Sequence, residues 1–348
     1  MRKFIKTKTI VISAVSCLAL LAGTANAKTA PTLRIENFIG TIDVTTSGTG
    51  KIVINEADGA PVSRSGENIT IDAGYKINNS RCKQNRHSIK IDIGKWKLNK
   101  RGGGYKNLTE YPHMKISAPS NVNLIIEKSV IFGDVENIGS GDIHVRSCGK
   151  LNVGDVSGDM VLGISGSGDI NMGDVAGDLR VRISGSGDAE IGDANTQSGA
   201  SVVRVSGSGD LLAGNLASLE LEISGSGDVT AGNIANGAKI HSSGSSDIEL
   251  GRIEGYLDYS GSGSSDFDAD SIVGDLSVRA SGAGDITIDG GDVDTLYIKA
   301  SGASNVDYDG RSKDAEAYAS GAADISINRP TGNLRSHEGG AGDVHVDG

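Results

Sequence analysis

The feature that most constrains this chain is a repeat of about 19 residues. The segment Ser-Gly-Ser-Gly-Asp at 165–169 returns at 184–188, and we take its last residue as an anchor position. A unit this short cannot bury its own apolar face, so a period near 20 residues predicts stacked coils that share one core. After Asp169 and Asp188, the anchors recur at intervals of 18 to 22 residues, at Asp210, Asp228, Asp247, Asp266, Asp285, Asn305, Asp324 and Asp343.

Apolar and polar residues alternate within each cycle. Leu179, Val181 and Ile183, for example, flank Arg180 and Arg182. Alternation with period two, between turns rich in Gly, Ser and Asp, is typical of half-buried strands, and each cycle predicts two strands of roughly three and five residues. We therefore predict an all-β fold, a single-stranded β-solenoid in the form of a parallel β-helix with coils of about 19 residues.

The N-terminus has the pattern of a secretory signal peptide over residues 1–27. Basic residues precede an apolar run at 10–21, and Ala25-Asn26-Ala27 fits a cleavage site before Lys28. No other apolar run in the sequence is long enough to span a bilayer. We therefore predict an exported bacterial protein, periplasmic or at the cell surface, with no transmembrane segment after signal cleavage.

The mature chain divides into two parts of one solenoid. Residues 122–348 follow the regular repeat, whereas 28–121 form its irregular start. Within that start, 40–52 aligns with the cycle at 177–189, which places Lys51 at an anchor position. The segment 76–106 breaks the repeat with ten basic residues against one acidic residue. It predicts a long loop or an inserted hairpin, and such loops often carry function.

Two cysteines remain after signal cleavage, Cys82 and Cys148. An export compartment permits a disulfide, but two cysteines do not define a disulfide framework. Cys148 lies in a turn next to a predicted core strand, which favours a buried, unreactive thiol. The sequence leaves open whether the two cysteines pair.

The net charge of −11 is unevenly distributed, because the acidic excess comes mostly from the turn aspartates. Such aspartates hydrogen-bond their own backbone in tight turns and need no partner to explain them. Calcium-binding solenoid turns read Gly-Gly-x-Gly-x-Asp, whereas here the Asp follows Gly directly. We predict no metal and no cofactor, with weak calcium binding along the Asp edge as the alternative, and no nucleic-acid partner.

Little in the sequence indicates catalysis. The six histidines show no metal-ligand spacing, and no Gly-x-Ser-x-Gly nucleophile motif stands between a strand and a helix. We predict a non-enzyme that binds or adheres. Two alternatives stay open: a carbohydrate-active enzyme, either a polysaccharide lyase or a hydrolase, and a purely structural spacer.

One outward position of the longer strand is mostly basic. Stacked coils place equivalent side chains about 4.8 Å apart, so they would form a continuous row along the rod. Such a row could attract an anionic surface polysaccharide or another envelope component; alternatively, its cations simply pair with the acidic turns. The predicted ligand-binding residues are Arg146, Arg182, Arg204, His241, Arg279, Lys299 and Tyr318.

The last inward position of the same strand changes from large to small residues along the chain. It reads Ile164, Ile183, Val205 and Ile223 in the earlier coils, then Ser242, Gly261, Ala280, Ala300 and Ala319. Large aliphatic side chains contribute about 1.5–3 kcal/mol each when buried, and small ones much less. We therefore expect the C-terminal coils to be narrower or flatter and to open first.

The signal peptide, Ile42-Asp43-Val44 and the Ser-Gly-Ser-Gly-Asp turns together resemble a known family. These turns begin at Ser165, Ser184, Ser206 and Ser224. The chain resembles bacterial proteins that carry the head GIN domain of autotransporter adhesin-like proteins. The resemblance implies a right-handed β-helix on an exported protein with an adhesin-like role. It brings no catalytic residues.

Overall fold

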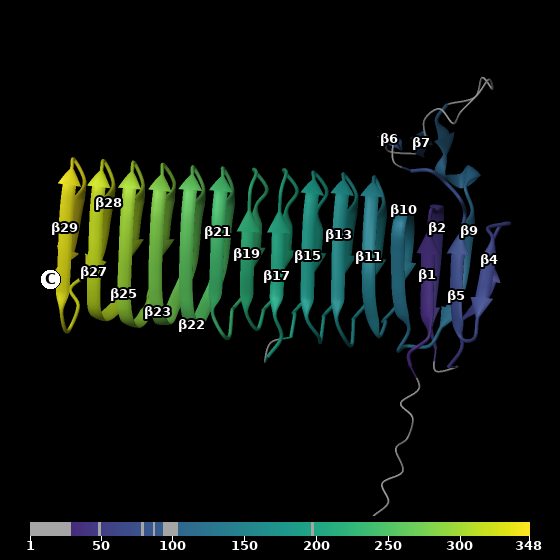
Figure 1. Ribbon diagram of the computed structural model, residues 1–348, viewed down its shortest axis with the longest axis horizontal. Coiled ribbons are helices and arrows are strands. Elements are labelled where there is room, and N and C mark those ends of the chain that lie inside the picture. Colours follow the sequence, from purple (N-terminus) through teal and green to yellow (C-terminus); the bar gives the residue numbers. More distant parts are fainter. Residues whose placement is uncertain (1–28, 48–49, 78–79, 86–87, 93–103, 196–197) are drawn as a thin grey trace, which may run out of the picture.

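The computed structural model describes residues 29–47, 50–77, 80–85, 88–92, 104–195 and 198–348. They form a long rod of stacked coils in which nearly every strand pairs in parallel with its equivalent in the next coil (Figure 1). This confirms the predicted all-β solenoid. The predicted signal peptide, residues 1–27, lies outside the described residues. Within the described residues, no helix is long and apolar enough to cross a membrane.

Two strand-bearing faces run along the rod, and we call them the long-strand face and the anchor face. The long-strand face contains, in spatial order, β4 (Val62–Ser65), β5 (Asn68–Asp72), β1 (Thr32–Glu36), the first part of β10 (Asn123–Val135), β11 (Ser140–Ser147), β13 (Met160–Gly166), β15 (Leu179–Gly185), β17 (Ser201–Val205), β19 (Leu219–Ile223), β21 (Ala238–Gly244), β22 (Asp247–Gly263), β23 (Asp266–Gly282), β25 (Gly291–Gly302), β27 (Arg311–Gly321) and β29 (Leu334–Gly340). Its neighbouring strands are parallel, except that β4 is antiparallel to β5.

The anchor face carries the repeated Asp positions at the start of its strands. It contains, in spatial order, β3 (Val53–Glu56), β9 (His113–Ala118), β2 (Ile39–Thr46), the second part of β10, β12 (Lys150–Val153), β14 (Asp169–Met172), β16 (Ala189–Ile191), β18 (Leu211–Ala213), β20 (Val229–Ala231), the first parts of β22 and β23, β24 (Asp285–Ile288), β26 (Asn305–Tyr308), β28 (Asp324–Asn328) and β30 (Asp343–Asp347). The two faces match the predicted pair of strands in each cycle.

A third inward row, which the sequence reading missed, lies between the two faces. It consists of single buried residues joined by isolated parallel bridges: Ile138, Val156, Val175, Ala194, Leu216, Ile234 and Ile253. From β22 onward this row becomes part of continuous strands, and β22 and β23 are each 17 residues long. The core is therefore enclosed on three sides.

The rod does not begin with the first strand of the chain. Strand β1 lies between β5 and β10, and β2 lies between β9 and β10, so a later segment builds the outermost coil. The predicted alignment of 40–52 with 177–189 is consequently wrong. Ile42 pairs with Gly133 of β10 on the anchor face, where Thr41, not Lys51, shares the register of the anchors.

The described part of the basic segment 76–106 pairs apart from the main sheet of the rod, and we call this segment the insert. Its described part forms an antiparallel sheet of β6 (Arg81–Asn85), β7 (Ser88–Asp92) and β8 (Lys106–Asn107), followed by the 3-10 helix η1 (Leu108–Glu110). This insert stands at the side of the rod near its N-terminal end (Figure 1). It covers a small apolar cluster outside the main core: Ile39, Ile77, Ile91, Tyr111, Val130, Phe132 and Cys148.

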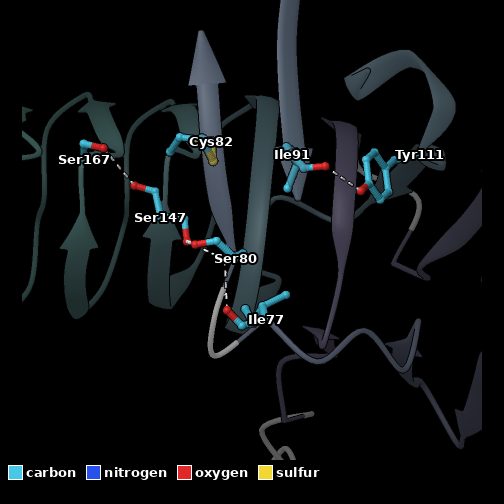
Figure 2. The surroundings of a disulfide bond; sticks show 8 residues. Ile77, Ser80, Cys82, Ile91, Tyr111, Ser147 and Ser167 are labelled. Carbon is cyan, nitrogen blue, oxygen red and sulfur yellow. Dashed lines mark hydrogen bonds between the residues drawn. A yellow bond between two sulfur atoms is a disulfide. The ribbon is translucent and has the colours of Figure 1, made fainter. Parts of the chain in front are cut away.

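A disulfide joins the insert to the rod. Cys82 of β6 is bonded to Cys148, which follows β11, and 66 positions separate the two residues (Figure 2). The expectation of an unreactive thiol at Cys148 is therefore wrong: the residue is buried because the insert covers it, which no local pattern around Cys148 shows. A cross-link that closes a loop of this length stabilises the folded chain by about 4 kcal/mol, because it reduces the conformational entropy of the unfolded chain.

The register confirms the predicted change at the last inward position. Ile223 pairs with Ser242, which pairs with Gly261 and then Ala280. At Gly261 the Tyr259 side chain fills part of the lost volume, because a Cβ there would lie 2.6 Å from the Tyr259 hydroxyl oxygen. The buried Tyr259 ring lies 4.9 Å from that of Phe267. The order in which the coils open stays a prediction that hydrogen exchange can test.

Candidate functional site

The anchor aspartates form a hydrogen-bonded ladder. The carboxylate of Asp188 accepts the backbone N–H of Asp210 at 3.0 Å, and Asp210 accepts that of Asp228 at 2.9 Å. Asp228 in turn accepts the N–H of Asp247 at 2.9 Å. Each carboxylate thus bonds the equivalent residue one coil further on, not its own turn as predicted from the sequence. The repeated Asp has a structural role between coils.

A second ladder follows the turn after the anchor-face strand. Asp155 accepts the backbone N–H of Asp174 at 3.1 Å, and Asp174 accepts that of Asp193 at 2.9 Å. A groove of about 720 Å³ runs over this ladder. Among the described residues no group of three or more His, Cys, Asp or Glu side chains is placed to hold a metal ion. The groove therefore has acidic walls without a ready-made metal centre.

The ladder formed by the anchor aspartates is interrupted at Asp247. The backbone N–H of Asp266 is donated to the carbonyl of Ser246, not to the Asp247 carboxylate. Partial burial, followed by the charges of Asp228, Asp266 and Asp268, raises the pKa of Asp247 above its usual value. At Asp247 the carboxylate therefore lies near other carboxylates without bonding the next coil.

The predicted basic row is present on the long-strand face, with one correction. From Gly163 the paired positions continue through Arg182, Arg204, Glu222, His241, Ser260, Arg279, Lys299, Tyr318 and His337, and we call this set the basic row.

Arg146 does not belong to the basic row. It pairs with Ser165, whereas His144 pairs with Gly163, so the predicted alignment was two residues out at this end. Gly163 lies directly beneath the His144 ring, where a Cβ would be 2.0 Å from Nδ1. His144 Nε2 also lies 3.0 Å from Asp142 Oδ1. A histidine beside a carboxylate therefore occupies this end of the row.

Some cations of the basic row are paired and others are not. Arg204 donates to Glu222, one coil further along the same row, at 3.0 Å, and Arg279 donates to Asp258 at 2.9 Å. Arg182 and Lys299 are exposed, and within the described residues neither has a hydrogen-bond or ion-pair partner. The alternative that acidic groups neutralise the row holds for Arg204 and Arg279 only.

Aromatic side chains lie at the C-terminal part of the row. The rings of Tyr297 and Tyr318 are 5.9 Å apart, and the Arg279 guanidinium lies 5.1 Å from the centre of the Tyr297 ring. Tyr318 donates its hydroxyl to Glu316 at 3.0 Å. Tyr297 was not among the predicted site residues; its outward position next to Arg279 and Lys299 in the alternation could have indicated it.

Comparison with protein-family models identifies one family. The model described as "Putative auto-transporter adhesin, head GIN domain" matches residues 67–252 and again residues 233–348. These stretches include the basic row, the anchor ladder and the whole insert. No curated protein and no solved structure matches the chain at the required significance.

Proposed function

The chain belongs to the head GIN domain family, and from that premise we propose that it is an exported, non-catalytic adhesion rod whose basic row binds an anionic polysaccharide. The family description supports an adhesin-like role. The Cys82–Cys148 disulfide supports export, because disulfides form and persist in oxidising compartments. The polysaccharide would belong to a cell surface or to the envelope.

The observation that carries this proposal is the alignment of unpaired cations on a single row. Arg182 and Lys299 are separated by six coil steps. At about 4.8 Å a step they lie roughly 29 Å apart, a distance that a polymer can span and a small molecule cannot. Arg204 and Arg279 stand between them, and their exposed ion pairs contribute only about 0–1 kcal/mol each, so a bound polyanion can replace the partners.

The cations of the basic row and the tyrosine side chains beside them both favour an acidic sugar polymer as the ligand. Carboxylates or sulfates repeated along a chain would meet cations repeated along the row, in a salt-dependent interaction. Tyr297 and Tyr318 offer amphipathic surfaces beside the cations, which suits sugar rings that are polar at their edges. The acidic anchor face would repel the same polymer and so restrict it to one side of the rod.

Charge reversal tests the proposal. We expect Arg182, Arg204 and Arg279 changed together to Glu to abolish binding of polygalacturonate to the mature protein, with unchanged melting. The matched control reverses Arg252, Arg311 and Arg329, three exposed arginines off the row, and should bind as the parent does. Dextran serves as the neutral polymer. Equal binding by the row variant, or binding insensitive to salt, would contradict the proposal.

A replacement variant and a second assay complete this experiment. If the triple variant melts early, Arg182→Gln with Lys299→Gln replaces it, because neither side chain has a partner to lose within the described structure. The same samples are assayed for new reducing ends. Their steady appearance with the parent protein would overturn the non-catalytic part of the proposal and favour the polysaccharide lyase or hydrolase alternative.

A further inference from the structure

A second hollow lies where the insert meets the rod. It has a volume of about 350 Å³ and is lined by Ile77, Ser80, Cys82, Arg146, Ser147, Ser165, Gly166 and Ser167. This volume is within the range of small-molecule sites in proteins, about 300–1,000 Å³. Residues of the basic row do not line it. We call it the junction groove.

The charged group of the junction groove is Arg146. Its side chain is half-buried, and within the described residues it has no hydrogen-bond or ion-pair partner. In the strand register Arg146 pairs with Ser165, and Ser165 pairs with Ser184. The equivalent positions in the next two coils therefore carry small side chains. A guanidinium presents several N–H donors in a planar fork that matches carboxylate or sulfate oxygens. A partly desolvated guanidinium without a partner favours an incoming oxyanion.

Hydroxyl groups form the rest of the polar lining. The Ser80 hydroxyl donates to the carbonyl of Ile77 at 2.9 Å and also contacts the Ser147 hydroxyl (Figure 2). Ser167 donates to the Ser147 carbonyl at 3.4 Å, whereas the Ser165 hydroxyl has no partner within the described residues. Hydroxyls both donate and accept, so this lining suits a ligand that itself carries hydroxyls.

The wall of the groove is held in place by the disulfide. Cys82 lines the groove, and its partner Cys148 lies two residues after Arg146. Ser147, between them, has a φ of 60°, a conformation uncommon for residues other than glycine. The Ser147 hydroxyl contacts that of Ser80, and the next residue, Cys148, carries the disulfide. The groove is therefore built from two segments far apart in sequence and fixed relative to each other.

We infer that the junction groove is a binding site for a single acidic sugar unit, which Arg146 holds by its carboxylate or sulfate while the serine hydroxyls contact its hydroxyl groups. The inference is independent of the basic row, which needs a polymer. The same sugar class at both sites would let the rod hold a chain end at the groove.

Titration with monosaccharides tests this site on the disulfide-intact mature protein. The probes are glucuronate and glucose 6-sulfate, with glucose as the neutral sugar and inorganic sulfate as the bare ion. We expect saturable binding of at least one acidic sugar and none of glucose. Arg146→Gln should weaken that binding at least tenfold, whereas Arg182→Gln, the matched change on the basic row, should leave it unchanged.

Three outcomes would overturn the inference: no binding of either acidic sugar, unchanged binding by Arg146→Gln, or inorganic sulfate binding as tightly as the sugars. Ser165→Ala provides a second variant if Arg146→Gln fails to fold, and we expect it to weaken acidic-sugar binding severalfold. Because a monosaccharide cannot span the basic row, failure here and failure of polymer binding are separate results.

Discussion

The anchor face and the basic row illustrate two uses of a repeated side chain. On the anchor face the carboxylates of Asp188, Asp210 and Asp228 are bonded to backbone N–H groups of the next coil. On the basic row Arg182 and Lys299 have no hydrogen-bond or ion-pair partner within the described residues. The more regular motif is thus structural, and the less regular one is available for binding. Regularity in a solenoid reports on how coils stack, and function is better sought where the repeat varies.

The largest stability difference should come from two aspartates of the anchor face. Asp228→Ala removes the acceptor for the N–H of Asp247 and should lower the free energy of unfolding by about 1 kcal/mol. Asp247→Ala removes a carboxylate that bonds no further coil and should cost nothing or stabilise. Urea denaturation of both variants checks this. Equal losses would show that the ladder is not the reason for the repeated Asp.

The ion pair on the basic row should have a smaller effect. Arg204 and Glu222 are 51% and 62% exposed, so their coupling in a double-mutant cycle of Arg204→Gln and Glu222→Gln should be about 0.5 kcal/mol or less. Thermal or urea unfolding of the four proteins gives the coupling. A value well above 1 kcal/mol would mean that the row is mainly a structural ladder, as the anchor face is.

Asp247→Asn should show a small effect that depends on pH. The folded-state pKa of Asp247 is raised, so its contribution to stability is full below the unfolded value of 3.8 and is lost as pH rises through the folded pKa. The Asn variant, which stays neutral, should therefore melt slightly higher than the parent at pH 7 and equally at pH 3. A lower melting temperature at pH 7 would contradict this description of the anchor face.

Removing divalent cations should have the smallest effect of all. A ligand that binds only the folded state stabilises it by mass action, so a structural calcium site would make melting sensitive to a chelator. We expect EDTA to shift the melting temperature by no more than about one or two degrees, because the ladder carboxylates already accept hydrogen bonds. A large drop that calcium restores would reassign the anchor face as a metal site.

The periodic part of the chain could be predicted from sequence, and the start of the rod could not. Alternation and spacing place Leu179, Val181 and Ile183 inside and Arg182 outside, because each coil repeats the environment of the last. Strand β1 pairs with β5 and β10, which are distant in sequence, so no local period places it. The Cys82–Cys148 disulfide could not be predicted for the same reason, because its two residues are also distant in sequence.

The candidate sites divide in the same way. The basic row follows from register once the coil length is known. The pairing of β11 with β13 is uninterrupted at a spacing of 19 residues, so the regular count places His144, not Arg146, opposite Gly163. The junction groove could not be predicted, because three of its eight lining residues, Ile77, Ser80 and Cys82, come from the insert and the others from the rod. Sequence reading singled out the insert as the break in the repeat, and contact between insert and rod creates the groove.

Residue-resolved hydroxyl-radical footprinting of the mature protein with and without polygalacturonate distinguishes binding on the basic row from binding on the anchor face. We expect protection of His241, Tyr297 and Tyr318 on and beside the basic row. Leu212 and His345, exposed on the anchor face, should react equally in both samples. Protection of Leu212 and His345 with full reactivity along the basic row would show that the polymer binds the other face, and would contradict the assignment of structure to one face and binding to the other.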